Sequence, residues 1–409
     1  MTKEANKVVL AYSGGLDTSV AIQWLKNTYN CKVVAMIGDV GQQEDLEFIR
    51  KKAEATGADK VYVEELQDEF ARHYLVPMLK ANALYERKYL LGSAVSRPLL
   101  GKALVNVAAK ERADAVAHGC TGKGNDQVRF ELAVKALAPH LKIIAPWREW
   151  EIQSREDAMS YAHKSGIEIS TTKKKPYSID RNLWHSSYEG GVLEDPLVEP
   201  EEEMFLMTCS PEQARSEPEY IQLGFQDGTP THLNGERLSS LELIKHLNTI
   251  AGRHGIGRTD MIEDRLLGMK SRGVYETPGG TVLIRAKQEI EEITLDKDTI
   301  QFNEMIASKY AELVYNGLWF SRLKEGLDAY VNHIQKYVTG EVKLKLYKGN
   351  TMTAGKRSPY TLYREDLATF EEDEVYNHKD AEGFINLFGL SVLTQGKVNR
   401  EYEMGEHNE

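Results

Sequence analysis

Short apolar runs alternate with amphipathic stretches along the first 166 residues. The runs of strand length are Val8 to Ala11, Lys32 to Ile37, Lys60 to Val63, Ala113 to His118 and Ile143 to Ala145. Apolar residues at helical spacing or helix-start signals predict helices over Val20 to Leu25, Glu44 to Thr56 and Asp68 to Ala81, one opening at Arg97-Pro98, and one from Ser154 to Gly166. Strands that alternate with helices predict an α/β domain with a parallel, doubly wound sheet.

The pattern changes at about Ile167, where we place a domain boundary. The pairs Asp227-Gly228 and Asn234-Gly235 predict antiparallel hairpins. Leu241 to Ala251 and Phe302 to Gln335 have helical spacing, and Val342 to Tyr347 alternates as a strand does. We therefore expect a nucleotide-binding domain over residues 1–166, an α+β domain over 167–370 and a C-terminal arm over 371–409.

The arm is unusually apolar for a terminal segment. Its apolar residues are Phe384, Ile385, Leu387, Phe388, Leu390, Val392 and Leu393. Such a surface favours docking on another subunit, and folding back onto its own chain stays open as the alternative.

The first strand runs into a glycine turn, Ser13 to Ser19, that is typical of a phosphate cradle. Gly14 and Gly15 let the backbone approach a ligand, and Asp17 lies at a helix start. Free backbone N–H groups, hydroxyls and the positive end of the helix dipole suit a polyphosphate. The string is neither a Walker P-loop nor a Rossmann fingerprint.

Composition narrows the class of protein. The 409 residues are 41% hydrophobic and 28% charged, which is ordinary for a globular protein. We find no signal peptide and no apolar run of about 18 residues, so we expect a cytoplasmic protein without a membrane span. A net charge of −11 argues against nucleic acid as a partner, and Lys173 to Lys175 are interpreted as a solvated loop. Cys31, Cys120 and Cys209 are far apart, which favours reduced thiols.

A second glycine-rich loop, His118 to Glu131, follows the fourth strand. Asn125 and Arg129 are four residues apart and share a helix face, and Asp126 is close enough to Arg129 to interact. An amide, a carboxylate and a guanidinium at one helix start could grip a zwitterionic amino acid. The alternative, a helix cap with an internal ion pair, leaves the three glycines of the loop unexplained.

The motif S-G-G-L-D-T-S at Ser13 to Ser19 resembles the signature of the PP-loop ATP pyrophosphatases, which cleave ATP between the α and β phosphates. Together with Tyr89 to Gly92, His118 to Glu131, Ala145 to Arg148 and Gly268 to Pro278, it resembles the argininosuccinate synthase family from about Val8 to Pro359. The resemblance implies a C–N ligase that joins L-citrulline to L-aspartate through a citrullyl-adenylate, with AMP and pyrophosphate as products. Such a reaction needs the charge on the departing pyrophosphate neutralised, so we expect Mg²⁺ as a cofactor. The resemblance also implies a homotetramer.

The resemblance also implies site residues. ATP positions are Ala11, Tyr12, Ser13, Gly14, Gly15, Leu16, Asp17, Thr18, Ser19, Gly38 and Gly119. Aspartate positions are Thr121, Asn125 and Asp126. Citrulline positions are Tyr89, Asn125, Arg129, Ser178, Ser187, Glu263 and Tyr275. Asp126 is a candidate proton acceptor whose main expected task is binding, and the metal ligands stay unassigned.

One position departs from the family pattern. Ala94 stands where some members have a serine near citrulline, and the loss of one hydrogen bond costs on the order of 1 kcal/mol unless Ser93 or water replaces it. Two alternatives stay open: another adenylating ligase, such as an amide synthetase or a tRNA-thiolating enzyme, and a catalytically silent nucleotide-binding assembly protein. The absence of an N-terminal cysteine nucleophile and of a basic surface disfavours the first, and the intact glycines disfavour the second.

Overall fold

The computed structural model describes residues 5–122, 124–152, 154–167, 177–369, 375 and 377–406. The chain divides into two compact units, one ending at Tyr360 and one beginning at Thr361. Among the helices in these ranges, none is long and apolar enough to cross a membrane. Lys173 to Lys175 lie outside the described residues.

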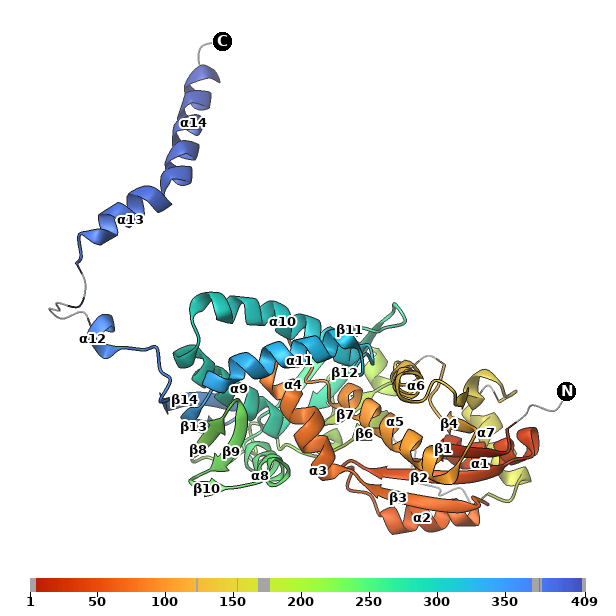
Figure 1. Ribbon diagram of the computed structural model, residues 1–409. Coiled ribbons are helices and arrows are strands. Elements are labelled where there is room, and N and C mark those ends of the chain that lie inside the picture. Colours follow the sequence, from red (N-terminus) through yellow and green to blue (C-terminus); the bar gives the residue numbers. More distant parts are fainter. Residues whose placement is uncertain are drawn as a thin grey trace. The chain divides into compact units, whose positions relative to one another are not determined.

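The first unit begins with a five-stranded sheet in which every strand is parallel to its neighbours (Figure 1). Its order is β3-β2-β1-β4-β5. The strands are β1 (Lys7–Ala11), β2 (Lys32–Asp39), β3 (Lys60–Glu65), β4 (Ala115–His118) and β5 (Lys142–Ile144). The predicted parallel sheet is confirmed. Because β1 leads to β2 on one side while β4 lies on its other side, the switch point for a ligand falls at the ends of β1 and β4.

Helices cover both faces of this sheet because its strands are apolar on both faces. Val8 and Leu10 pack with residues of α1 (Leu16–Tyr29), α2 (Leu46–Ala55) and α7 (Arg155–Lys164). Val9 packs on the opposite face with α5 (Gly92–Glu111) and α6 (Asp126–Leu137). The expected helix after β3 is formed by α3 (Gln67–Phe70) and α4 (Val76–Lys80), joined by a π turn at Ala71–Leu75.

The start of α5 differs from the prediction. We expected Pro98 in the first helical turn, but α5 begins at Gly92, after Leu91 in the left-handed region (φ 61°), and Pro98 lies in its interior. An interior proline removes one backbone hydrogen bond. Burial of Val95 before Pro98 and of Leu99 after it helps the helix to continue through the proline.

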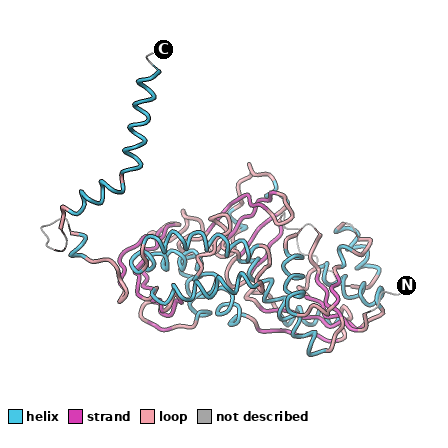
Figure 2. The backbone as a smooth tube through the Cα atoms, turned by 45° about the horizontal axis from the view of Figure 1, so that its top comes forward, coloured by secondary structure: helices cyan, strands magenta, loops and turns pink. Residues whose placement is uncertain are grey.

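The rest of the first unit holds two antiparallel sheets, seen as separate groups of strands in Figures 1 and 2. The five-stranded sheet has the order β10-β9-β8-β13-β14. It contains β8 (Glu219–Gln226), β9 (Thr229–Leu233), β10 (Glu236–Arg237), β13 (Gly340–Tyr347) and β14 (Asn350–Arg357). The four-stranded sheet, in the order β11-β12-β7-β6, contains β6 (Ser178–Arg181), β7 (Ser186–Glu189), β11 (Arg258–Asp264) and β12 (Lys270–Glu276). Both predicted hairpin turns are confirmed, with positive φ at Asp227-Gly228 and Asn234-Gly235.

Four helices accompany these sheets: α8 (Ser240–Gly252), α9 (Pro278–Thr294), α10 (Lys297–Tyr315) and α11 (Arg322–Ile334). The helical stretch predicted over Phe302 to Gln335 is therefore two helices. Gly317 has a φ of 74° and ends the first, and the Ser321 side chain caps the second. A Cβ on Gly317 would lie 2.7 Å from the Cα of Arg129, so only glycine lets this turn approach α6.

The second unit contains α12 (Glu365–Ala368), α13 (Asp380–Phe388) and α14 (Leu390–Glu406). Within this unit, the apolar side chains predicted for the arm are exposed, from 54% at Leu390 to 77% at Phe388. Phe384 and Phe388 stack on each other one turn apart.

Candidate active site

A cavity of about 810 Å³ lies at the carboxyl ends of β1 and β4. Its wall includes the loop after β1, the loop after β4 and one side of α2. The two loops touch, because a Cβ on Gly119 would lie 2.7 Å from the Thr18 methyl group. The glycine after β4 is thus needed to close the cavity between the two glycine loops.

The loop after β1 is held by its own hydroxyl groups. The Ser13 and Thr18 hydroxyls are 3.2 Å apart, and the Ser19 hydroxyl donates to the Gly15 carbonyl at 2.8 Å. Gly14 has a φ of 76°, and a Cβ there would lie 3.0 Å from the Ile49 side chain. Gly15 at the N-cap of α1 and Thr18 in its first turn line the cavity, where backbone N–H groups and the helix dipole favour an anion.

A smaller pocket of about 100 Å³ adjoins the cavity. Five residues line both spaces: Arg97, Gly124, Asp126, Asp180 and Glu189. The larger space has the volume for a ligand of nucleotide size, and the smaller one is lined by charged and hydroxyl side chains that suit a polar ligand. These shared residues therefore mark the place where the two ligands would meet.

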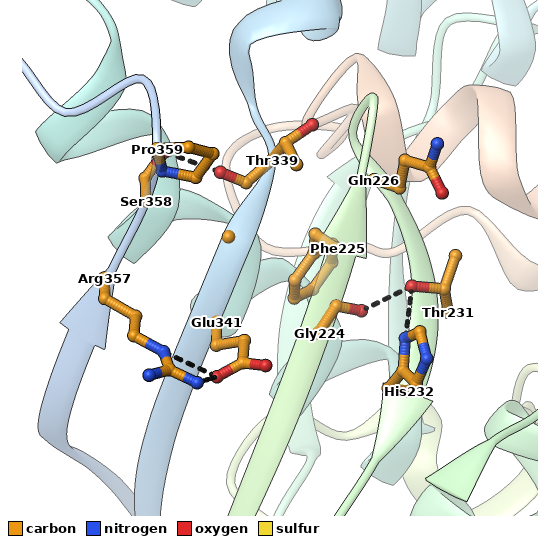
Figure 3. Close-up of a pocket in the computed structure, with 11 residues that line it drawn as sticks. Gly224, Phe225, Gln226, Thr231, His232, Thr339, Glu341, Arg357, Ser358 and Pro359 are labelled. Carbon is orange, nitrogen blue, oxygen red and sulfur yellow. Dashed lines mark hydrogen bonds and ion pairs between the residues drawn. The ribbon is translucent and has the colours of Figure 1, made fainter. Parts of the chain in front are cut away.

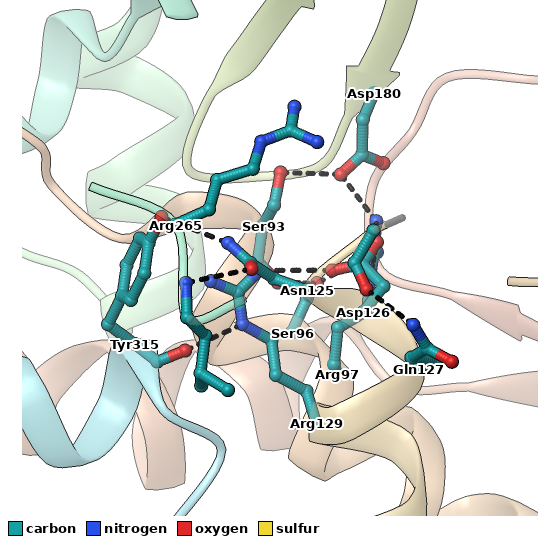
Figure 4. Close-up of polar contacts among 12 residues, drawn as sticks. Ser93, Ser96, Arg97, Asn125, Asp126, Gln127, Arg129, Asp180, Arg265 and Tyr315 are labelled. Carbon is teal, nitrogen blue, oxygen red and sulfur yellow. Dashed lines mark hydrogen bonds and ion pairs between the residues drawn. The ribbon is translucent and has the colours of Figure 1, made fainter. Parts of the chain in front are cut away.

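Asp126 lies at this junction between two guanidinium groups (Figure 4). Arg97 contacts its Oδ2 at 2.9 Å, and Arg129 contacts its Oδ1 at 3.0 Å. Burial would raise the pKa of Asp126, but the two positive charges outweigh it, and the pKa lies below its usual value. Arg97 also donates to Asp180 at 2.6 Å, and it thereby joins strand β6 to the start of α6.

Asn125 precedes α6 without capping it through its side chain. Its Nδ2 instead donates to the Tyr315 hydroxyl at 2.9 Å, and its Oδ1 accepts from the Leu266 amide at 3.1 Å. Arg129 donates to the Tyr315 carbonyl at 2.8 Å and lies over the Tyr315 ring. The amide and the guanidinium are thus fixed by the end of α10, which weakens the helix-cap interpretation.

Glu263 offers an uncompensated carboxylate oxygen inside the smaller pocket. The residue is 6% exposed, and within the described part of the chain its Oε2 has no hydrogen-bond partner. Burial raises the pKa of Glu263 to about 7, although a hydrogen bond from Tyr275 and the charges of Arg129 and Arg265 oppose the shift. A cation entering this pocket would hold the carboxylate in its ionised form.

Family models match almost the whole chain. The model for the Arginosuccinate synthase N-terminal HUP domain matches residues 7–168, and that for the Arginosuccinate synthase C-terminal domain matches residues 177–395. The chain belongs to the argininosuccinate synthase family. The resemblance found in the sequence is thereby confirmed.

Curated relatives called argininosuccinate synthase cover the same span. That of Carboxydothermus hydrogenoformans is 61% identical over 98% of this chain and all of its own length. That of Caldanaerobacter subterraneus subsp. tengcongensis is 58% identical over 98% of this chain and 97% of its own. Among solved structures, the match to a U34-tRNA thiolase from Methanococcus maripaludis spans 43% of this chain and 61% of the thiolase chain. The identity is 19% and the TM-score 0.29, too low to indicate a shared overall fold.

The argininosuccinate synthase positions expected from the sequence gather at the two spaces with few exceptions. Those that line the cavity are Ala11, Tyr12, Ser13, Gly14, Gly15, Thr18, Gly38, Gly119, Thr121 and Asp126. Those that line the smaller pocket are Tyr89, Asn125, Asp126, Arg129, Ser187, Glu263 and Tyr275.

Four expected positions are not on either wall: Leu16, Asp17, Ser19 and Ser178. Ser19 is buried and bonded within the loop, whereas Ser178 is exposed at the start of β6. Ala94 is fully buried in the core, and its neighbour Ser93 faces the pocket. The family departure at Ala94 therefore removes no side chain from this pocket.

Other wall residues carried no signal in the sequence. Arg97, Asp180, Glu189, Arg265 and Tyr315 come from separate elements that only the folded chain brings together. Burial raises the pKa of Glu189 despite its ion pair with Arg265. In the sequence, Arg97 stands out only as the residue before Pro98. Its contacts with Asp126 and Asp180 join residues 29 and 83 positions apart, which no local spacing predicts.

Another cavity, of about 500 Å³, lies on the sheet of β8, β9 and β13 (Figure 3). Its charged residues Arg357 and Glu341 form an ion pair with each other. The wall also includes the apolar residues Phe225 and Pro359 and several polar side chains, among them Gln226 and Thr231. Neither of the two glycine loops lines this cavity, and no site residue implied by the family resemblance does. The cavity at β1 and β4 is therefore the candidate active site.

Proposed function

We propose that the chain catalyses ATP-dependent ligation of L-citrulline and L-aspartate to argininosuccinate, with AMP and pyrophosphate as the other products. The observation that carries the proposal is the junction of the two spaces. A nucleotide at the first glycine loop and citrulline in the smaller pocket would meet beside Arg97 and Asp126, where aspartate has to enter. All three substrates of the family reaction thus have adjoining places.

In the first step, the citrulline ureido oxygen attacks the α-phosphorus of ATP, and the bond to pyrophosphate breaks. The loop after β1 would hold the phosphates through N–H groups and the Ser13 and Thr18 hydroxyls. Glu263 would hold the citrulline ammonium, and Arg129 its carboxylate. The protein contributes mainly position and charge stabilisation, which is what phosphate transfer requires.

In the second step, the aspartate ammonium loses a proton to solvent, the resulting amine attacks the ureido carbon, and AMP leaves as the bond from that carbon to the adenylate oxygen breaks. Asp126 has a lowered pKa, because Arg97 and Arg129 stabilise its ionised form. A weakly basic carboxylate is a poor proton acceptor but a good partner for an ammonium. We therefore assign Asp126 to holding aspartate, with Asn125 and Thr121, rather than to taking its proton.

Mg²⁺ would enter with ATP. Burial raises the pKa of Glu44, and the nearby charge of Asp180 raises it further. A divalent cation held by these side chains would favour their ionised forms. Glu44 and Asp180, which both line the cavity, are the residues that would hold it. Bound there, Mg²⁺ would neutralise charge on the departing pyrophosphate.

Pyrophosphate release from ATP should require both citrulline and aspartate for sustained turnover. With either amino acid omitted, the coupled pyrophosphate assay should fall to background. Full release without citrulline would instead indicate another adenylating reaction. Purified protein that releases no pyrophosphate with both amino acids present would contradict the ligase assignment and favour a silent nucleotide-binding protein.

We also propose a cytoplasmic homotetramer in which the arm docks on another subunit. Within the second unit, the apolar residues of α13 and α14 are not covered by one another, and such surface is costly in water, which supports this arrangement.

Removal of residues after Gly383 should lower the particle mass measured by light scattering from about four chains to fewer. The apolar residues then lost would otherwise bury surface between subunits. An unchanged mass would show that the arm folds back on its own chain.

A further inference from the structure

Lys52 has a place in the nucleotide cavity that neither the sequence motif nor the spacing pointed to. It lies on α2 on the same side as Phe48 and Ile49, and all three line the cavity. Its Nζ donates to the Gly14 carbonyl at 2.6 Å. The lysine is therefore attached to the glycine at the centre of the loop after β1.

The charge of Lys52 is not balanced by a carboxylate. Among the described residues, no Asp or Glu forms an ion pair with it. Burial lowers the pKa of Lys52, which is the cost of holding a charge there without a partner. Among the described residues of the cavity wall, the other guanidinium or ammonium group is that of Arg97, which is already paired with Asp126 and Asp180.

We propose that Lys52 is a positioning residue for the polyphosphate of ATP and that it holds the departing pyrophosphate rather than the AMP part. The ammonium group has three donors, and only one is used by the Gly14 carbonyl. The others can reach phosphate oxygens held by the same loop. This inference rests on the proposed placement of ATP at Ser13 to Thr18.

The position also explains why a lysine suits this site. A point charge on a flexible stem can follow pyrophosphate as its bond to the α-phosphorus breaks. The bond to Gly14 keeps the ammonium beside the loop in the absence of nucleotide. The Lys52 ammonium on α2 and the phosphate-binding loop before α1 then form one binding site.

The test compares ATP, AMP and inorganic pyrophosphate binding to full-length Lys52→Met by calorimetry. We expect ATP and pyrophosphate affinity to fall about 10- to 100-fold, as for a lost charge-assisted hydrogen bond, and AMP affinity to change less than about twofold. Lys51→Met is the matched control, because Lys51 is the next residue on α2, is 68% exposed and pairs with Glu47 at 3.6 Å. It should leave all three affinities unchanged, and Lys52→Arg should restore part of the loss.

Equal weakening of ATP and AMP would overturn the proposal, since Lys52 would then only hold the loop in shape. Unchanged ATP affinity in Lys52→Met would overturn it as well. If Gly14→Val bound ATP as tightly as the unsubstituted protein, the nucleotide would not bind at this loop. The proposed role of Lys52 would then be wrong as well. The thermal transition of each variant shows whether it is folded.

Discussion

Gly14→Val is expected to abolish ATP binding while the protein still unfolds in one cooperative transition. Gly14 has a φ of 76°, which a β-branched residue adopts only at a cost of about 1–2 kcal/mol or more. A Cβ would also lie 3.0 Å from the Ile49 side chain. The loop must then move, and its N–H groups lose their common direction. An increase of at least about 100-fold in the dissociation constant, measured by calorimetry, corresponds to roughly 2.7 kcal/mol.

Gly15→Ala provides the comparison within the same loop. Gly15 has a φ of −71°, and the nearest atom to an added Cβ is the Ser13 Oγ at 3.5 Å, an ordinary contact. The Gly15→Ala variant should therefore retain most of the ATP affinity. Nucleotide affinity that survives in Gly14→Val, with the far-ultraviolet spectrum unchanged, would show that this loop does not hold the phosphates.

The parallel sheet was predictable from sequence because its strands are buried on both faces. Val8, Val9 and Leu10 form an uninterrupted apolar run, and each residue enters one of two cores on opposite faces. The hairpins were predictable for a different reason. Asp227-Gly228 and Asn234-Gly235 take positive φ, which these residue pairs adopt with little cost.

The errors arose where burial overrides a local signal. Pro98 is a typical first-turn residue, but tertiary packing carries α5 six residues further toward the N-terminus. The spacing over Phe302 to Gln335 is helical on both sides of Gly317, and nothing in the periodicity shows that this glycine must pass close to Arg129.

The candidate site divides in the same way. Residues in the two glycine loops could be found from motifs, because backbone shape and hydroxyl groups are local properties. Arg97 and Asp180 could not be found from motifs, because they contribute to the site through a contact between residues 83 positions apart in the sequence. Lys52 is a third case. It lies in an ordinary amphipathic helix, and only the cavity next to it distinguishes it from Lys51.

Asp126→Ala should impair aspartate use far more than ATP binding. The carboxylate separates the guanidinium groups of Arg97 and Arg129, and no other described acid contacts both. Its loss removes a charged partner of the aspartate ammonium and leaves Arg97 paired with Asp180 alone and Arg129 bonded to the Tyr315 carbonyl without an ionic partner. Because the Asp126 side chain is 31% exposed, we expect a loss smaller than that for a fully buried pair, roughly 100-fold in kcat/KM for aspartate. ATP affinity should change by less than about threefold.

Asp68→Ala is a matched control, because Asp68 forms a surface ion pair with Arg72 at 3.4 Å in which both side chains are more than half exposed. Such pairs contribute little, so every kinetic constant should stay within about twofold. The distinction lies in the pattern of losses. If Asp126→Ala reduced ATP, citrulline and aspartate use equally, Asp126 would serve only to hold α6 against α5. A selective loss for aspartate follows only if this carboxylate binds the incoming amine beside the adenylate.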